Sequence, residues 1–95
     1  MHYRITKVFH QAGKRQEIVD YLNRMENEIK SIQGLQSLRL LEISETESYG
    51  ISVYENEQQI KDAEEQVREI MSGMMPFMTS APEIVSGGVF WSLEF

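Results

Sequence analysis

Two amphipathic segments of helix length, each set between strand-like segments, constrain the fold of this 95-residue chain more than any other feature. Within each segment apolar residues recur three or four positions apart, and the 3.6-residue turn of an α-helix places such residues on one face. The two sets are Ile18, Leu22, Met25, Ile29 and Ile32, and Ile60, Ala63, Val67, Ile70 and Met74. The order of elements along the chain therefore reads βαββαβ.

Alternation of apolar and polar residues with a period of two predicts four strands. They are expected at about residues 3–10, 38–44, 49–54 and 84–95, with the polar residues 45–48 joining the middle two as a hairpin. In the last strand one face is expected to carry Val89, Trp91, Leu93 and Phe95. The pair Gly87-Gly88 predicts a bulge or bend there.

Local signals predict the ends of both helices. Gly13 is the expected N-cap of the first helix, which runs to about residue 33 and stops at Gly34, a residue able to adopt the left-handed C-cap conformation. Asn56, followed three residues later by Gln59, resembles a capping box that opens the second helix, and Gly73 closes it. Two exposed i,i+4 ion pairs are expected, Glu26 with Lys30 and Glu64 with Arg68.

Two right-handed βαβ halves joined by a hairpin give a ferredoxin-like α+β fold, a four-stranded antiparallel sheet with two helices on one face. We expect residues 1–95 to form this single domain. The strands carry bulky apolar residues at both parities, such as Leu40 and Leu41 or Phe90 and Trp91, whereas a sheet with one solvated face alternates cleanly. A second copy of the chain is therefore expected to cover the other face, giving a homodimer.

Composition argues against several kinds of partner. Nine Lys and Arg residues against fifteen Asp and Glu give a net charge of -6, so the phosphates of a nucleic acid would be repelled on average. The chain has no cysteine, which excludes disulfides and thiolate metal sites and fits a reducing cytoplasm. No apolar run approaches the roughly 18 residues that span a bilayer, so we expect a soluble, unprocessed cytoplasmic protein with no membrane partner.

The two histidines do not predict a metal site. His2 and His10 lie at the same parity of the first strand, and eight residues of extended chain separate them by roughly 26 Å. They therefore cannot bind one metal ion, and no metal is expected. His10 is interpreted as a polar residue at a strand end, with proton transfer at the mouth of a barrel as the alternative.

Nearly the whole chain resembles the dimeric α/β-barrel superfamily, and within it the antibiotic biosynthesis monooxygenase-like proteins. Gly13-Lys14 lies between the first strand and helix, where those proteins often have a Gly followed by charged residues, and Gly34 precedes the second strand. The segment Val53-Tyr54-Glu55-Asn56 occupies the strand-to-helix corner where many relatives have Trp followed by Glu. The resemblance implies that two ferredoxin-like sheets pair into a barrel.

The resemblance also bears on chemistry. Relatives that cleave haem use an Asn on the first strand, a Trp at the corner and a His on the second helix, whereas this chain has no Asn on that strand, Tyr54 at the corner and no His in residues 57–75. Haem degradation is therefore disfavoured, and no cofactor is expected. Other relatives let an electron-rich aromatic substrate react directly with oxygen, and the sequence leaves that chemistry open.

Six residues are candidates for ligand binding: Tyr54, Trp91, Arg4, Arg39, Met75 and Phe77. The two large aromatic residues combine an apolar body with one hydrogen-bonding atom, and packing in a core or interface is the alternative. The two arginines lie within strands and could hold an anionic substrate or an interface carboxylate. Met75 and Phe77 belong to a methionine-rich segment that could form a lid over a pocket or simply fill the core. No catalytic residue can be named.

Three functions are consistent with these features. The favoured hypothesis is a small dimeric protein that binds a hydrophobic or aromatic molecule, because no catalytic constellation is visible. The alternative is a cofactor-independent monooxygenase-like enzyme in which Tyr54 orients an electron-rich aromatic substrate. A regulatory amino-acid-binding domain of similar topology is a third hypothesis, which Gly13 favours and Lys14-Arg15 disfavours. Topology alone does not separate them.

Overall fold

An antiparallel sheet of four strands, in the order β2-β3-β1-β4, organises the computed structural model, which describes residues 1–95. Its elements are β1 (His2–Phe9), α1 (Arg15–Arg24), α2 (Glu26–Lys30), β2 (Leu35–Ser44), β3 (Glu47–Tyr54), α3 (Glu57–Ser72), the short 3-10 helix η1 (Met75–Phe77) and β4 (Glu83–Gly88). The predicted ferredoxin-like α+β fold is confirmed. No helix is both long and apolar enough to cross a bilayer.

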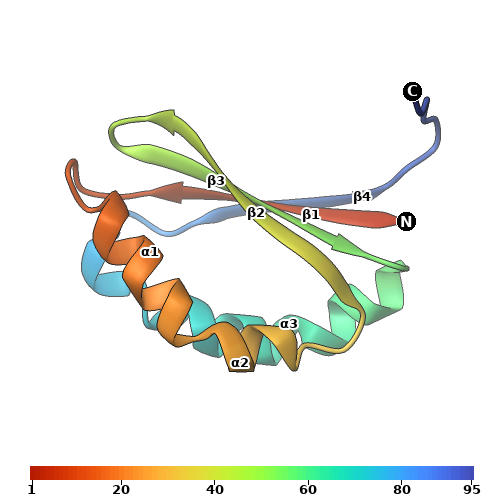
Figure 1. Cartoon of the computed structure of the whole chain (residues 1–95), viewed down its shortest axis with the longest axis horizontal. Helices are drawn as coiled ribbons and strands as arrows, with labels where there is room; N and C mark the ends of the chain where they lie inside the picture. Colours follow the sequence, from red (N-terminus) through yellow and green to blue (C-terminus); the bar gives the residue numbers. More distant parts are fainter.

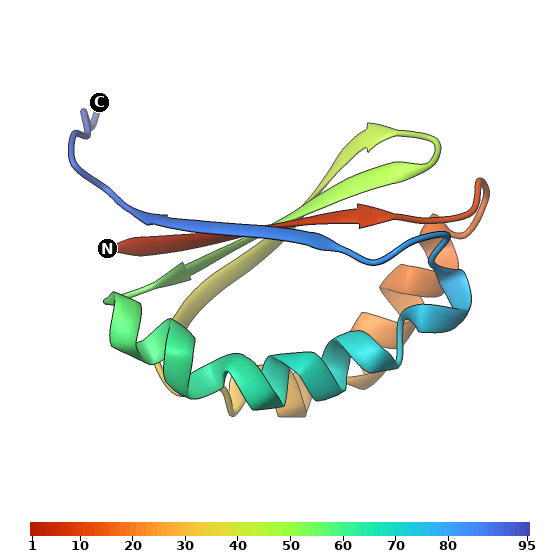
Figure 2. The ribbon, with the colours of Figure 1, turned by 180° about the vertical axis from the view of Figure 1, so that it is seen from behind.

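All the helices lie on one side of the sheet and leave the other side bare (Figure 1, and from behind Figure 2). Directly opposed residues of an antiparallel pair share a face, so the register divides the strands into two sets. Thr6 and Val8 of β1 are buried beneath the helices. Ile5 lies on the bare side, opposite Ile51 of β3 and Val85 of β4. The helices therefore cover the less apolar side of β1, the side that carries Arg4 and Thr6.

The first predicted helix is divided in two at Met25. The amide of Met25 donates to the carbonyls of both Tyr21 and Leu22, each at 3.1 Å, and its φ and ψ of -94° and 10° are not helical. This shared hydrogen bond kinks the helix without moving the apolar stripe off the sheet, since Ile18 and Ile32 are both buried. The prediction of one helix to residue 33 is wrong, because α2 ends at Lys30.

The predicted helix ends are confirmed in part. Gly34 has φ +87°, the left-handed conformation expected of it, and the side chain of Asn56 accepts a hydrogen bond from the amide of Gln59 at 3.0 Å. The N-cap of α1 is Lys14 and not Gly13, which forms the preceding turn with φ +77°. Of the expected ion pairs, Glu26–Lys30 forms at 3.6 Å and Glu64–Arg68 does not, while Glu57 pairs with Lys61 at 3.5 Å.

The last predicted strand is too long. β4 ends at Gly88, which pairs with His2, and the final ladder hydrogen bond runs from the amide of Val89 to the carbonyl of Met1 at 3.0 Å. The seven residues that follow Gly88 belong to no strand. The segment 89–95 extends beyond the sheet on its bare side (Figure 1), and Trp91 is 72% exposed.

Candidate functional site

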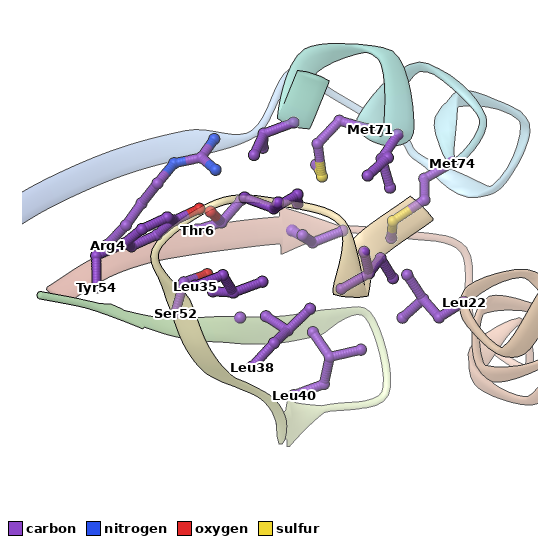
Figure 3. A pocket seen from close by; sticks show the side chains of 16 residues that line it. Arg4, Thr6, Leu22, Leu35, Leu38, Leu40, Ser52, Tyr54, Met71 and Met74 are labelled. Carbon is purple, nitrogen blue, oxygen red and sulfur yellow. The ribbon is translucent and has the colours of Figure 1, made fainter. Parts of the chain in front are cut away.

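The inner face of the sheet and the helices enclose a cavity of about 70 Å³. Sheet residues form its floor and residues of α1, α2 and α3 form its roof (Figure 3). Twelve of the sixteen lining residues are hydrophobic, so the interior suits an apolar ligand better than water. The lining residues are Arg4, Thr6, Val8, Leu22, Ile29, Ile32, Leu35, Leu38, Leu40, Gly50, Ser52, Tyr54, Val67, Ile70, Met71 and Met74.

Polar groups gather at one end of this cavity. Arg4 and Tyr54 enter from β1 and β3, while Met74 and Leu22 lie at the opposite end (Figure 3). The register explains the first pair, because Tyr54 lies opposite His2, one inward-facing position along β1 from Arg4. The site is therefore an apolar chamber with a guanidinium and a phenol at one end.

Burial changes the acid–base properties of both groups. The Tyr54 side chain is 1% exposed, and this loss of solvent raises the pKa of its phenol, with the neighbouring Arg4 cation opposing the shift. Burial also lowers the pKa of Arg4, against the attraction of Tyr54 and of Glu64 on α3. Arg4 takes part in none of the four ion pairs of the chain. Its positive charge thus lies at the edge of the apolar cavity without a bonded carboxylate.

Two of the six predicted ligand residues, Arg4 and Tyr54, line this cavity together, and the other four lie elsewhere. Arg39 is exposed on the bare face of the sheet, and Trp91 lies in the segment after β4. Met75 is 67% exposed and lines a separate surface hollow, whereas Phe77 packs against the buried cluster around Val8, Ile18 and Met74.

Several cavity residues escaped the sequence analysis. Thr6 and Ser52 are buried polar residues of β1 and β3 that face the helices, and Met71 extends from α3 between the chamber and the surface. In an alternating strand Thr6 shares a face with Arg4, and Ser52 shares a face with Tyr54. The sequence did not show which face of each strand the helices cover. The more apolar side of β1 is the bare one, so hydrophobicity alone indicates the wrong side.

His10 has a structural environment. It is fully buried, with Nδ1 2.9 Å from the carbonyl oxygen of Gln11 and Nε2 2.9 Å from the hydroxyl of Ser48. Since a carbonyl only accepts, Nδ1 carries the proton toward Gln11, and in the neutral ring Nε2 accepts from Ser48. Arg15 in turn donates to the same hydroxyl at 3.2 Å. This network ties the start of α1 to the β2–β3 hairpin, and His10 does not line the cavity.

The site does not fit a haem. A cavity of about 70 Å³ is roughly half the size of the 150 Å³ cavity that accommodates benzene in another protein, and a porphyrin is far larger than benzene. No histidine lines the cavity. The geometry thus agrees with the departures of this sequence from the haem-cleaving pattern.

Comparison with solved structures identifies the fold. SnoaB, a cofactor-independent oxygenase from Streptomyces nogalater, superposes with a TM-score of 0.78 at 12% identity, over 97% of this chain and 95% of that one. A variant of MhuD with two manganese protoporphyrin IX molecules per active site gives 0.78 at 13% identity over both whole chains. An antibiotic biosynthesis monooxygenase superposes with a TM-score of 0.72 at 9% identity, over 94% of this chain and 98% of that one.

These structures confirm the resemblance to the antibiotic biosynthesis monooxygenase-like proteins at the level of the fold. No family sequence model matches the chain, and no curated protein matches it in sequence. One of these neighbours holds a metalloporphyrin, and another is a cofactor-independent oxygenase. Function therefore depends on the site of this chain.

Proposed function

We propose that this protein binds a small hydrophobic or aromatic molecule in the cavity between the sheet and the helices. The observation that carries the proposal is the lining of that cavity, in which twelve of sixteen residues are hydrophobic and the polar groups come from the strand residues Arg4, Thr6, Ser52 and Tyr54. Met71 and Met74 line it with unbranched, flexible side chains that can move to admit a ligand larger than the present space.

Titration with indole, an uncharged aromatic compound, tests this proposal. In ¹H–¹⁵N spectra we expect saturable shifts at the amides of Thr6, Ser52 and Val67, whose side chains line the cavity. The amides of Glu45 and Gln58, which lie outside it, serve as internal controls. Shifts that are absent, or that are equal at both sets of amides, would overturn the proposal.

We further propose that the protein acts as a homodimer in the cytoplasm. On the bare face of the sheet Val85 is 55% exposed and Leu41 45% exposed, and the segment 89–95 adds Phe90 at 99% and Trp91 at 72%. Apolar surface of this extent favours burial against a partner, and a second copy offers the same surface by symmetry. The absence of cysteine agrees with a reducing compartment.

Sedimentation tests the dimer. The wild-type chain should sediment at twice its mass of 11.1 kDa at micromolar concentration, and Val85→Asp should sediment as a folded monomer. The matched control is Val19→Asp, which places the same charge on the exposed surface of α1 and should leave the dimer intact. A wild-type monomer would refute this part of the proposal.

A cofactor-independent oxygenase is the second candidate function, and the pairing of Tyr54 with Arg4 favours it. A phenol and a guanidinium at one end of an apolar chamber could orient an electron-rich aromatic substrate and stabilise the negative charge that develops as it reacts with oxygen. Oxygen uptake with 1,8-dihydroxynaphthalene measures this activity. We expect Tyr54→Phe to lower the rate and leave the dimer unchanged. Equal uptake with and without protein would exclude oxygenation of this substrate.

A further inference from the structure

Arg4 also lines a second hollow, a surface cleft of about 310 Å³ between α3 and β4. The cleft contains three cationic residues, Arg4, Lys61 and Arg68, and two acidic residues, Glu57 and Glu64. This balance is positive in a chain whose net charge is -6. The cleft is thus locally suited to an anion despite the acidic character of the whole protein.

The cations of this cleft are not equally available. Lys61 pairs with Glu57 at 3.5 Å, whereas neither Arg4 nor Arg68 takes part in an ion pair. Arg4 is attracted by the phenol of Tyr54 and by the carboxylate of Glu64. The predicted partner of Arg68, Glu64, does not reach it. Two guanidinium groups that are bonded to no carboxylate therefore line one cleft, and guanidinium groups bind carboxylates with matching planar geometry.

The cleft and the inner cavity meet at two side chains. Arg4 and Met71 are the residues that line both hollows. In Figure 3, Arg4 extends from β1 toward the α3 side of the chamber, and Met71 projects from α3. The flexible side chain of Met71 can move, so a ligand can extend from the cleft into the cavity at this point. Its polar end would then lie in the cleft beside Arg4, and its apolar end would lie in the cavity.

From this arrangement we propose that the ligand is an amphipathic monocarboxylate, with its carboxylate held by Arg4 and Arg68 and its apolar chain passing Met71 into the cavity. This inference rests on the proposed binding function and names its ligand class. An unbranched alkyl chain that carries one carboxylate is the simplest molecule that has both features.

Calorimetric titration with octanoate, octan-1-ol and acetate tests the charge and the chain separately. Octanoate should bind at least tenfold more tightly than octan-1-ol, which lacks the charge, and acetate, which lacks the chain, should bind too weakly to measure. If octan-1-ol binds as tightly as octanoate, the apolar-binding function stands and this inference is overturned. If neither octanoate nor octan-1-ol binds while indole still does, only this inference fails.

Substitutions of the arginines test which residues hold the carboxylate of octanoate. Arg4→Met should weaken octanoate binding at least tenfold and remove the preference for octanoate over octan-1-ol. Arg68→Met, on the surface of α3, gives a second variant that spares the interior and should weaken octanoate binding by about threefold. The matched control is Arg24→Met, which removes an exposed guanidinium on α1 that lines neither hollow. Equal losses in Arg24→Met and Arg68→Met would refute the assignment of the cleft.

Discussion

Replacing Ile70 with alanine should weaken the fold and enlarge the ligand cavity at the same time. Ile70 is 8% exposed, lines the cavity, and packs in one buried cluster with Ile32, Tyr54 and Ala63. Truncation of a buried isoleucine to alanine lowers the free energy of unfolding by about 2–5 kcal/mol. Because one side of Ile70 already borders empty space, it makes fewer contacts there, and we expect a loss of about 2–3 kcal/mol.

Urea unfolding followed by far-ultraviolet circular dichroism measures this loss. Protein concentration must be equal in all samples, since a dimer would make the apparent stability depend on it. Ile70→Val is the matched control and should lose about 0.5–1.5 kcal/mol. The hydroxyl of Tyr21 donates a hydrogen bond to the backbone carbonyl of Ile70 at 2.7 Å, and both substitutions keep this bond because they leave the backbone unchanged.

A bound ligand should restore much of the unfolding free energy that Ile70→Ala loses. Indole at about one hundred times its dissociation constant adds about 2.7 kcal/mol to the folded state, if it binds only that state. Ile70→Ala has more room than the wild type, so it should bind indole more tightly and recover most of its stability. Equal stability of wild type and Ile70→Ala, or no stabilisation of Ile70→Ala by indole, would refute the cavity as described.

Three further predictions concern the surroundings of the site. Gly73→Ala should lower the unfolding free energy by about 1–3 kcal/mol, because the new Cβ would clash with the Tyr21 hydroxyl oxygen, and the loss should shrink in a Tyr21→Ala background. Ser48→Ala should cost about 1–3 kcal/mol in urea unfolding by leaving Nε2 of buried His10 unpartnered, and Ser48→Thr should restore most of it. Burial raises the pKa of the Tyr54 phenol above its ordinary 10.0, so the unfolded chain loses this proton at a lower pH than the folded protein does. The free energy of unfolding should therefore be unaffected by this group below pH 10 and should decline as the pH rises toward the pKa of the folded state. This part of the decline should be absent from Tyr54→Phe.

The sequence predicted the architecture because periodicity reports which residues share a face. The two apolar stripes and the four alternating segments were enough to give βαββαβ, and Gly34 and Asn56 marked helix ends through local backbone chemistry. The kink at Met25 was missed because it arises from one shared hydrogen bond within an unbroken apolar stripe. The end of β4 was missed because it depends on the pairing between β4 and β1, which alternation along one strand does not report.

The site was predictable only in part. Arg4 and Tyr54 stood out because each places a polar group within an apolar strand, and the structure brings them to one cavity. Trp91 and Arg39 stood out for the same reason and lie outside it. Alternation divides a strand into two faces but does not say which face the helices cover. On β1 they cover the face that carries Thr6, the less apolar of the two.

A crystal structure of the protein with octanoate bound is the most decisive test of the proposed ligand site. We expect electron density for the alkyl chain between the sheet and α3, passing Met71, with both carboxylate oxygens within hydrogen-bonding distance of Arg4 or Arg68. Octanoate bound only on the bare face of the sheet, or a cavity still empty at saturating octanoate, would contradict it.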